Sequence, residues 1–426
     1  MLSVAEALDR VLAGVPVLPA ETVPLSLALG RVLAEPVVAG REIPPWDNSS
    51  MDGYAVRAAD LRGASPANPV TLTVVGEVAA GTIAREGIGP AQAYRILTGA
   101  PLPSGSDAVV PQEEVERDGD RVVFTRPAEP GAYVRPRGED IRPGDRLLEP
   151  GTELRPAALG VLAALGQARV RVYQRPRVAV LSTGDELVAP DAPLGPGQIP
   201  DSNSYTLAGL AADAGAVPQP LGIARDRREE LVERLRQGLD ADVLVSSAGV
   251  SVGDRDFVRE AIEALGARLD FWKVNMRPGK PLTFGRVGGR AGGRSADRAD
   301  GRVGDCLFFG LPGNPVSCMV TFELFVRPVL RRLGGHRVLE RPRVRAQALQ
   351  RIDNPGSRPG YLRVRLEPVA GGRVGARPTG MQGSAILRSM LLADGLAVVP
   401  GDTHILQGGE VEVILLLSDG LVTSGG

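Results

Sequence analysis

The sequence predicts a multidomain protein in which an α/β unit is combined with strand-rich units. Its 426 residues are more than one ordinary domain holds. Gly and Pro, at 54 and 36 residues, make up about a fifth of the chain, which favours short elements and turns over a helical bundle. Between residues 175 and 335, apolar strand-like runs alternate with helix patterns, which is typical of a parallel sheet covered by helices.

The first part of the chain carries three helix signals. Ser3 and Glu6 form a capping-box pattern ahead of an apolar helical face. A second, short helix is expected over residues 25–34. Pro156, at a first-turn position, opens a third over residues 157–165. We expect these helices to form one unit.

Strand and turn signals fill the stretch between the second and third helices, where short apolar runs and alternating patterns dominate. The sequence therefore predicts a helical N-terminal unit made of residues 1–42 and 143–174. A β-rich domain over residues 43–142 is inserted into it.

The α/β unit, residues 175–335, contains four expected strands at residues 178–181, 242–246, 281–285 and 306–310. Its expected helices are residues 203–214, 227–239 and 256–265. The stretch 288–304 is rich in Gly, Arg, Ala and Asp and is expected to be a disordered surface insertion. Residues 336–426 return to a strand pattern and predict a small β-barrel or sandwich, of which we expect the barrel. Its expected strands are 343–349, 361–366, 396–399 and 410–416.

Net charge and cysteine content restrict the function. A net charge of −1 argues against a nucleic-acid or membrane surface, and no apolar run is long enough to span a bilayer. The start of the chain lacks a signal-peptide pattern. Cys306 and Cys318 lie in apolar runs, and with only two histidines a tetrahedral zinc site cannot be assembled. We expect a reduced cytoplasmic protein whose metal chemistry uses oxygen ligands.

The only two lysines among 49 basic residues are Lys273 and Lys280, seven positions apart. They flank the turn 275–279, which carries Pro and Gly signals. A lysine presents a compact point charge suited to a phosphate or oxyanion, whereas arginine presents a planar fork. The clustering favours an anion site; the alternative is a compositional accident on a solvated loop.

Three unusual loops follow the expected strands, at the carboxyl ends where open α/β sheets bind ligands. They are residues 182–186, 248–256 and 311–317. Gly-rich turns expose backbone N–H groups, and helix N-termini favour anions. The neighbouring carboxylates favour Mg²⁺; they are Asp185, Glu186, Asp254 and Asp256. Taken singly, each loop also fits a plain helix cap, tight turn or rigid connector.

A second cluster of motifs comes from the β-rich segment. Residues 44–55 contain two prolines followed by the turn Asp52-Gly53, which projects a carboxylate. Residues 97–100 and 137–140 add further polar turns. By pattern alone these are ordinary turns.

Taken in order, these motifs resemble the molybdopterin molybdenumtransferase family, known as MoeA in bacteria and as the gephyrin E domain in animals. The motifs that carry the resemblance are Asn48-Ser-Ser-Met-Asp-Gly-Tyr-Ala55, Leu97-Thr-Gly-Ala100, Arg137-Gly-Glu-Asp140, Ser182-Thr-Gly-Asp-Glu-Leu187, Gly249-Val-Ser-Val-Gly253, Arg277-Pro-Gly-Lys-Pro281 and Leu311-Pro-Gly-Asn-Pro-Val-Ser317. They extend over nearly the whole chain. Two features depart from the family pattern. Ala248 stands where a Gly is common and is expected to tighten the phosphate loop slightly, and the insertion 288–304 is longer than usual.

The resemblance implies an elongated homodimer of four-domain chains, with a central parallel α/β domain of the molybdopterin-binding, MogA-like kind. It also implies a role as a linker or dimer domain for the helical N-terminal unit. The active site would form where that domain of one subunit meets the β-rich insert of the other. The reaction would insert molybdate into adenylylated molybdopterin with Mg²⁺-dependent release of AMP, the final step of molybdenum cofactor biosynthesis. Because the substrate's dithiolene sulfurs hold the molybdenum, the protein would supply cations, N–H groups and carboxylates instead of Cys or His ligands.

Matching positions imply roles for individual residues. The catalytic set is Asp52, Thr98, Asp140, Glu186, Asp226, Asp256, Lys273 and Lys280. The set that binds pterin, AMP and molybdate is Ser182, Thr183, Gly184, Gly249, Ser251, Gly253, Arg277, Pro278, Gly279, Pro312, Gly313, Asn314, Pro315, Ser317, Arg358 or Arg363, and Ser384. The implied Mg²⁺ ligands are Glu186 and Asp256. The residues that would reach in from the partner subunit are Asp52, Thr98 and Asp140.

Two other functions fit parts of the chain. Residues 178–317 also resemble the shorter molybdopterin adenylyltransferases, which load AMP from ATP onto the pterin and lack the flanking domains. Gephyrin-type E domains also act as scaffolds that cluster receptors, although nothing here resembles the long linker that accompanies that use. A separate adenylyltransferase and molybdoenzyme maturation factors are candidate partners, and no nucleic acid or membrane partner is expected.

Overall fold

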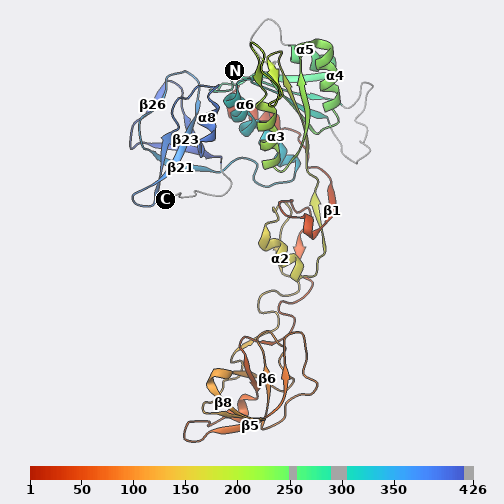
Figure 1. Cartoon of the computed structure of the whole chain (residues 1–426), viewed down its shortest axis with the longest axis vertical. Coiled ribbons are helices and arrows are strands. Elements are labelled where there is room, and N and C mark those ends of the chain that lie inside the picture. The colour runs from red at the N-terminus through yellow and green to blue at the C-terminus, as the bar shows by residue number, and fades with distance from the viewer. Residues whose placement is uncertain (249–256, 289–304, 417–426) are drawn as a thin grey trace.

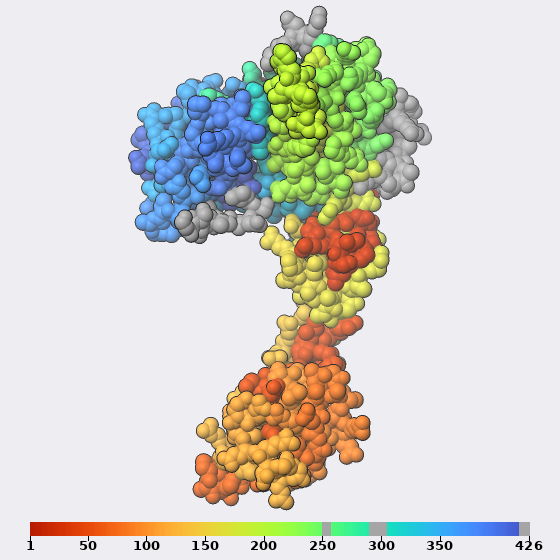
Figure 2. All heavy atoms as spheres, in the orientation of Figure 1, coloured from red at the N-terminus to blue at the C-terminus, as the bar shows by residue number. Residues whose placement is uncertain are grey.

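A computed structural model of the chain describes residues 1–248, 257–288 and 305–416. The molecule is elongated (Figure 1). The α/β unit and the C-terminal barrel lie side by side at one end, a small unit around β1 (Ala20–Pro24) and α2 (Pro156–Ala164) lies in the middle, and the β-rich unit forms the far end. The space-filling view shows a narrow middle between two wider ends (Figure 2). None of the helices in the described ranges is long and apolar enough to cross a bilayer.

The β-rich unit is built on a six-stranded sheet with the order β7-β4-β6-β5-β9-β8. β5 and β6 run parallel, and the other neighbouring strands are antiparallel. Successive residues of β4, Tyr54 and Ala55, are buried in two different apolar clusters, so both faces of the sheet are covered. The strands are β4 (Gly53–Val56), β5 (Val70–Val78), β6 (Gln92–Ile96), β7 (Ala108–Pro111), β8 (Val115–Asp118) and β9 (Arg121–Phe124). The 3₁₀ turns are η2 (Ala58–Leu61) and η3 (Gln112–Glu114), and the ribbon beside the sheet pairs β3 (Asn48–Ser49) with β10 (Val134–Arg135).

The middle unit packs α2 against two short antiparallel ribbons. These pair β1 with β12 (Arg169–Tyr173) and β2 (Val37–Val38) with β11 (Arg146–Leu148). The helix expected over residues 25–34 is wrong, because only η1 (Leu25–Leu27) is helical, as a single 3₁₀ turn. Val32 and Leu33 instead form isolated bridges to Glu153 and Val172 and bury their side chains. Tertiary packing therefore overrides the local helix preference there.

The first helix, α1 (Val4–Leu12), begins with the expected capping box. Ser3 Oγ accepts from Glu6 N at 3.2 Å, and Ser3 N donates to Glu6 Oε2 at 2.8 Å. Its buried face, Ala7 and Val11, packs against η4 and α7 in the core of the α/β unit. This differs from the expected grouping of all early helices in one unit, because the apolar face of α1 finds its partner across the domain boundary. The other domain boundaries stay predictions.

The α/β unit has a six-stranded sheet with the order β16-β13-β17-β20-β19-β18. The first four strands are parallel, as expected, and β18 and β19 add an antiparallel hairpin at one edge. The strands are β13 (Arg177–Thr183), β16 (Val217–Ala224), β17 (Val243–Ser247), β18 (Ala267–Lys273), β19 (Pro281–Val287) and β20 (Cys306–Leu311); a small parallel pair, β14 (Leu187–Val188) with β15 (Ile199–Pro200), lies outside the sheet. Two of the six strands, β16 and β18, were not expected; Pro218 and Pro220 argue against a strand, but β16 is an edge strand, where proline is tolerated.

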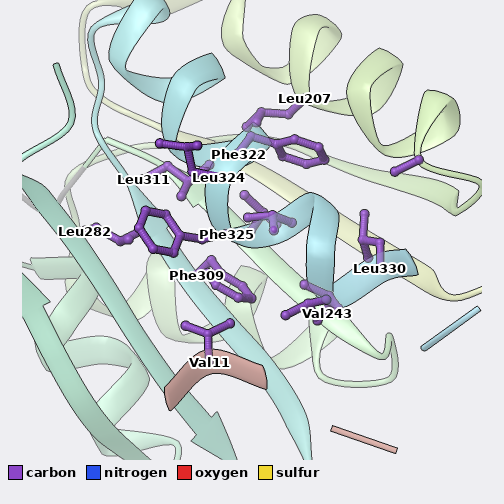
Figure 3. Close-up of a cluster of buried hydrophobic side chains, with 14 of the residues drawn as sticks. Val11, Leu207, Val243, Leu282, Phe309, Leu311, Phe322, Leu324, Phe325 and Leu330 are labelled. Atoms are coloured by element: carbon purple, nitrogen blue, oxygen red, sulfur yellow. The ribbon is translucent and has the colours of Figure 1, made fainter. Parts of the chain in front are cut away.

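Helices cover both faces of this sheet. α1, α3, α6, η4 and α7 bury apolar side chains on one face with Val243 and Phe309, and Figure 3 shows this cluster. α4 and α5 cover the other face, on which Leu181 and Phe308 are buried. The helices are α3 (Asn203–Asp213), α4 (Arg228–Gly238), α5 (Phe257–Ala264), α6 (Pro315–Thr321), the π-helical η4 (Phe322–Val326) and α7 (Arg327–Leu333). The expected insertion 288–304 lies, from residue 289 on, outside the described residues.

The C-terminal unit is a closed five-stranded barrel with the order β21-β24-β23-β25-β27, as the strand pattern predicts. Its strands are β21 (Arg343–Ala348), β23 (Gly360–Val369), β24 (Arg373–Pro378), β25 (Gly395–Val399) and β27 (Glu410–Leu415). Outside the barrel lie the ribbon of β22 (Ile352–Asn354) with β26 (Thr403–Ile405) and the short helix α8 (Leu387–Leu391). The expected α/β plus β fold class is therefore confirmed.

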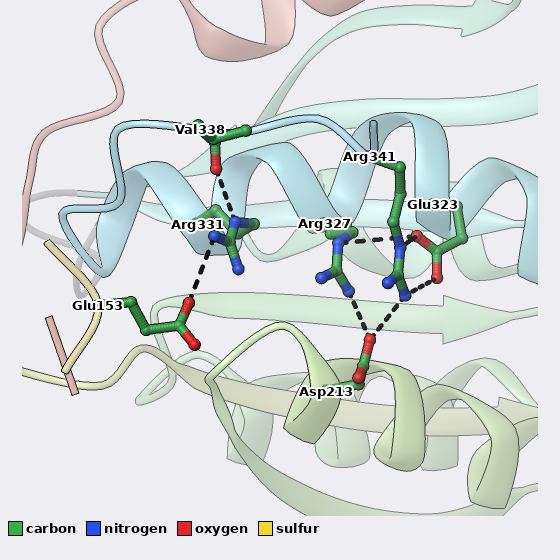
Figure 4. Close-up of polar contacts among 7 residues, drawn as sticks. All are labelled: Glu153, Asp213, Glu323, Arg327, Arg331, Val338 and Arg341. Atoms are coloured by element: carbon green, nitrogen blue, oxygen red, sulfur yellow. Dashed lines mark hydrogen bonds and ion pairs between the residues drawn. The ribbon is translucent and has the colours of Figure 1, made fainter. Parts of the chain in front are cut away.

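A buried ion network ties the α/β unit to the segment that leads into the barrel (Figure 4). Arg341 donates from Nε and Nη2 to the Glu323 carboxylate at 2.9 and 3.0 Å, and from Nη2 to Asp213 at 2.6 Å. Arg327 donates to the same Asp213 oxygen at 2.7 Å. The Glu323 side chain is only 2% exposed, so its charge depends on these guanidinium groups.

We expect Arg341→Met to destabilise the protein by about 3 kcal/mol, because Glu323 would stay buried without its main partner. Arg343→Met is the matched control, since Arg343 pairs with Glu340 and Glu412 at the surface and its loss should cost less than about 1 kcal/mol. Denaturant unfolding followed by circular dichroism measures both variants. Equal unfolding midpoints would contradict the assignment of Arg341 as the buried anchor.

Candidate active site

The loops singled out in the sequence meet at one edge of the central sheet. β16, β13, β17 and β20 run parallel, so their carboxyl ends share this edge. β19 runs antiparallel to β20 and begins at the same edge, where Thr283 pairs with Gly310. The hairpin that carries Lys273 and Lys280 therefore reaches the edge at which the other strands end.

Hydroxyl groups cross-link the strand ends beneath this edge. Ser182 and Ser247 are fully buried, and their Oγ atoms lie 3.1 Å apart. Thr183 Oγ1 donates to Ser247 O at 3.4 Å. Ser246 Oγ is buried and has no hydrogen-bond partner in the described part of the chain. Ser182 and Thr183, expected to bind substrate, thus contact the neighbouring strand.

The loop after β20 is held between α3 and the barrel. Asn203 Nδ2 donates to Gly313 O at 2.8 Å. Asn314 Nδ2 donates to Ser384 Oγ at 3.0 Å, and Val316 N donates to Ser384 O at 3.0 Å. The expected site residues Asn314 and Ser384 are therefore brought into direct contact. Pro312 and Pro315 belong to the same loop, and Ser317 is buried in the first turn of α6.

Contacts from the barrel also shape the lysine hairpin. Arg358 Nη1 donates to Met276 O at 3.0 Å, and Arg277 N donates to Pro359 O at 2.8 Å. Lys273 and Lys280 are half-buried, and neither ammonium group has a hydrogen bond or ion pair with any residue that the structure describes. Both charges are therefore available to an anion. In the turn between them, Pro278 and Gly279 are buried, whereas Arg277 is exposed.

Of the two arginines that the pattern left open, Arg363 is a structural residue of the barrel. Its side chain is fully buried, donating to Ser389 Oγ at 3.1 Å and to Gly383 O at 3.1 Å. Burial lowers the pKa of its guanidinium to about 10, with a smaller contribution from the charge of Arg277. Arg363 holds Gly383, the residue before Ser384. It therefore supports the position of Ser384, which contacts the loop after β20. Arg358 is the arginine that reaches the lysine hairpin.

Three carboxylates gather at the ends of β13 and β16. Asp226 N donates to Asp185 Oδ1 at 3.3 Å, and Arg225 Nη1 donates to Asp185 O at 2.6 Å. Partial burial and the nearby charges of Asp185 and Glu186 raise the pKa of the Asp226 carboxyl. Gly184 has φ +147°, and a Cβ there would lie 2.4 Å from Glu186 Oε2. Only Gly therefore lets the Glu186 carboxylate fold back over the strand end.

Ala248, the departure from the family pattern, has a left-handed backbone with φ 72°. Its N–H donates to Leu311 O at 3.0 Å, which continues the β17–β20 ladder past its end. A Cβ on Gly313 would lie 3.1 Å from that of Ala248. An L-residue in this region costs roughly 1–2 kcal/mol relative to glycine. The left-handed backbone at this position therefore explains why Gly is common there. The alanine side chain narrows the space beside Gly313.

The β-rich unit brings together two of its three expected site residues. Asp52 Oδ1 accepts from Thr98 Oγ1 at 2.7 Å and from Thr98 N at 2.8 Å. These two bonds, the side-chain bond first, hold the pKa of the Asp52 carboxyl below its usual range. Asp140 is exposed near the neck of this unit, where its N–H donates to Ile43 O at 3.0 Å. The unit lies at the opposite end of the molecule from the α/β unit (Figure 1).

Five residues expected in the site lie outside the described residues: Gly249, Ser251, Gly253, Asp254 and Asp256. The assignment of Asp256 as a metal ligand therefore stays a prediction. Among the described residues, no group of three or more His, Cys, Asp or Glu side chains has a geometry that holds a metal ion.

Comparison with known proteins follows the same domain order. Three family models match: the MoeA N-terminal region (domain I and II) over residues 2–166, the probable molybdopterin binding domain over 179–332, and the MoeA C-terminal region (domain IV) over 345–416. The molybdopterin molybdenumtransferase of a Nostoc species is 41% identical over 399 residues, which is 93% of this chain and 88% of that protein. Molybdopterin molybdenumtransferase 2 of Mycobacterium tuberculosis is 39% identical over 399 residues, 92% of this chain and 94% of its own.

The chain belongs to the molybdopterin molybdenumtransferase family. The crystal structure of the molybdopterin biosynthesis MoeA protein from Pyrococcus horikoshii agrees, with a TM-score of 0.79, 31% identity, and coverage of 97% of this chain and all of that one. The family expected from the motifs is confirmed. Individual site residues stay predictions, now with a geometry attached.

Three residues that shape this family site were missed or left out of the expected site set. Asn203 holds Gly313, Arg225 holds the Asp185 loop, and Ser247 pairs with Ser182. An Asn at the expected start of a helix marks Asn203 as a candidate cap, but no local pattern indicates its bond to Gly313 O. Arg225 and Ser247 carried no signal, since their contacts cross between strands that are far apart in the sequence.

The raised pKa of Asp226 predicts a pH-dependent effect on stability. The folded state holds the Asp226 proton more tightly than the unfolded state, so stability falls as pH rises from the unfolded pKa through the folded one. We expect Asp226→Asn to raise the thermal midpoint modestly at pH 7 and to leave it unchanged near about pH 3, where the carboxyl is protonated in both states. Glu116→Gln, at an exposed strand position, is the control.

Scanning calorimetry at the two pH values measures both variants. A gain that persists at the lower pH, or that Glu116→Gln also shows, would contradict ionisation of the Asp226 carboxyl, opposed by burial and by the charges of Asp185 and Glu186, as the cause.

Proposed function

We propose that this protein is a molybdopterin molybdenumtransferase that inserts molybdate into adenylylated molybdopterin, with Mg²⁺-dependent release of AMP. The observation that carries the proposal is the pair Lys273 and Lys280. Both are half-buried, neither is paired within the described residues, and their hairpin lies at the sheet edge where α/β proteins bind ligands. Both substrates are anionic, and two cations without a described acidic partner at such an edge suit them.

Each part of the site edge has a task under this proposal. Lys273 and Lys280 neutralise phosphate and molybdate charge as point charges. The loop 312–315, kept open by Asn203 and Ser384, presents backbone N–H groups to the same anions. Arg358 orients the lysine hairpin through Met276 O. The chain supplies positions and charge, while the dithiolene sulfurs of the pterin hold the molybdenum.

Oxygen ligands for a divalent cation would come from Glu186 and Asp226, completed by Asp256, because the described carboxylates do not form a metal-binding group by themselves. Partial burial and the charges of Asp185 and Glu186 raise the pKa of the Asp226 carboxyl, and a hard cation with oxygen ligands would favour its ionised form. Mg²⁺ bound there would neutralise charge on the phosphates of the adenylylated substrate. Glu186 and Asp226 would be the described residues that hold it, together with Asp256 beyond them.

The site is completed by a second copy of the chain. Asp52 and Thr98 form a prepared pair at the end of the molecule opposite the lysine hairpin, which favours their use in the site of a partner. A homodimer with two such shared sites follows, with Asp140 as a third contribution from the insert. The protein would act in the cytoplasm, receiving substrate from an adenylyltransferase and passing the cofactor to molybdoenzyme maturation factors.

The adenylyltransferase alternative accounts only for the central unit. The matched N-terminal and C-terminal family regions, residues 2–166 and 345–416, have no task in that reaction. The scaffold alternative would require the barrel surface to bind a peptide. Neither explains why the barrel contacts both the lysine hairpin and the loop after β20.

We expect purified protein, given Mg²⁺ and adenylylated molybdopterin, to release AMP only when molybdate is added. Lys280→Ala should lower turnover by about a hundredfold, because a cation aimed at developing negative charge is lost. Lys273→Arg keeps its charge and should lose less than about tenfold. Turnover of the wild type and of both variants is measured by chromatographic quantification of the AMP released.

Near-wild-type turnover in Lys280→Ala would remove the anion-site assignment. ATP consumption on unmodified molybdopterin, without molybdate-triggered AMP release, would move the function to the adenylyltransferase.

A mixing experiment tests whether the site is shared between subunits. Asp52→Asn and Lys280→Ala should each be nearly inactive alone. Equal amounts, exchanged by mild denaturation and refolding, should recover about a quarter of wild-type activity, because half of the dimers are mixed and each mixed dimer has one intact site. No recovery, with mixed dimers shown by native mass spectrometry, would place both residues in the same subunit's site.

A further inference from the structure

Arg95 is an arginine without an acidic partner close to the Asp52–Thr98 pair. It lies in β6, opposite Tyr54 of β4 in the antiparallel register. Its guanidinium carbon lies 5.4 Å from the centre of the Tyr54 ring, and its Nη2 donates to Gln112 Oε1. No ion pair joins it to an Asp or Glu in the described part of the chain, so no carboxylate there neutralises its charge by direct contact.

Gln112 connects this guanidinium to Asp52. The N–H of Gln112 donates to Asp52 O at 3.0 Å, while its side-chain oxygen accepts from Arg95. Asp52 precedes β4 directly, and Tyr54 of that strand pairs with Arg95. The positive charge of Arg95 adds to the two Thr98 hydrogen bonds in lowering the pKa of Asp52.

Other charged groups surround the pair but do not replace Arg95. Glu113, beside Gln112 on η3, accepts from Gln112 Nε2 at 3.2 Å, and Glu114 follows it. An open cavity on the sheet is lined by Arg95 together with Glu77, Arg117 and Asp120. Arg117 donates to Gly119 O at 3.0 Å and contacts neither Gln112 nor Asp52 in the described structure.

We propose that Arg95 is a positioning residue of the active site, which acts through Gln112 and its own charge to keep the Asp52 carboxylate ionised and in place against an anionic substrate. The inference rests on the proposed function, which brings Asp52 into the partner's site. There, burial and substrate phosphates would both favour the protonated carboxyl. Thr98 supplies two donors that oppose this protonation, and Arg95 supplies a fixed positive charge.

The first experiment reads Asp52 directly, without the reaction. Carboxyl carbons of the full-length protein labelled at aspartate are titrated by NMR, and Asp52→Asn assigns the resonance. We expect Arg95→Gln to raise the Asp52 pKa, Arg95→Lys to restore most of the difference, and Arg117→Gln to leave it unchanged. An unchanged Asp52 pKa in Arg95→Gln, in protein whose circular dichroism spectrum is native, would overturn the proposal.

The second experiment uses molybdate-triggered AMP release. Arg95→Gln should lower kcat by about tenfold with little change in KM, and should move the acidic limb of kcat to higher pH. Arg95→Lys should recover most of kcat, and Arg117→Gln should match wild type. Equal losses in Arg95→Gln and Arg117→Gln would show a merely structural role and overturn it. Absence of AMP release from the wild type would instead reject the proposed function, while the NMR titration still decides on Arg95.

Discussion

The pairing of β20 with its two neighbours brings the candidate site together. β20 is wholly buried and hydrogen-bonds in parallel to β17 and in antiparallel to β19. The parallel pairing puts the loop after β20 beside the end of β17, and the antiparallel pairing turns the start of β19 to the same edge. The loops that begin at residues 273 and 311 thus become neighbours because of β20, and β17 links β20 to β13, from which the loop after residue 182 leaves. Without the antiparallel switch, the two lysines would lie at the opposite edge of the sheet.

The barrel adds a second constraint on the site, because the barrel and the segment leading into it contact the α/β unit in two separate places. On one side, Arg341 is buried in an ion network with Glu323 and Asp213. On the other, Arg358 and Ser384 contact the two loops of the site. Apolar and ionic contacts away from the site edge of the sheet fix the position of the barrel. The loops of the barrel therefore reach the site without ion pairs to Lys273 or Lys280 in the described structure. The barrel is therefore part of the site's geometry as well as a neighbouring domain.

Much of the fold could be predicted because its main signals are local. β13, β17, β19 and β20 are short apolar runs bounded by turns, and the barrel strands follow the same pattern. The errors came where tertiary contacts decide. β16 contains Pro218 and Pro220 and was missed, since only its place at the sheet edge makes proline acceptable. The expected helix at residues 25–34 instead forms bridges to segments more than a hundred residues away. The amphipathic pattern of α1 predicts that one face of the helix is buried, but it does not indicate which unit that face packs against.

The site divides in the same way. Glycine-rich loops and the lysine pair mark it in the sequence, because few residue types satisfy such backbone and charge requirements. The burial of Arg363 and the bond between Asn203 and Gly313 are set by chain crossings that no local pattern records. Ala248 shows the intermediate case: the sequence marks it as unusual, and only its φ of 72° explains why.

Under the proposed function, the distance between the two halves of the site has an electrostatic consequence. A carboxylate such as Asp52 and an ammonium such as Lys280 would form an ion pair if one chain brought them together, and each would then be neutralised before substrate arrived. Here Asp52 is held by neutral donors from Thr98, with the charge of Arg95 nearby, and the lysines stay unpaired among the described residues. Each half thus keeps its charge in the separated state. Anionic substrate entering between two subunits would then meet the cations first, with the carboxylate already ionised on the facing side.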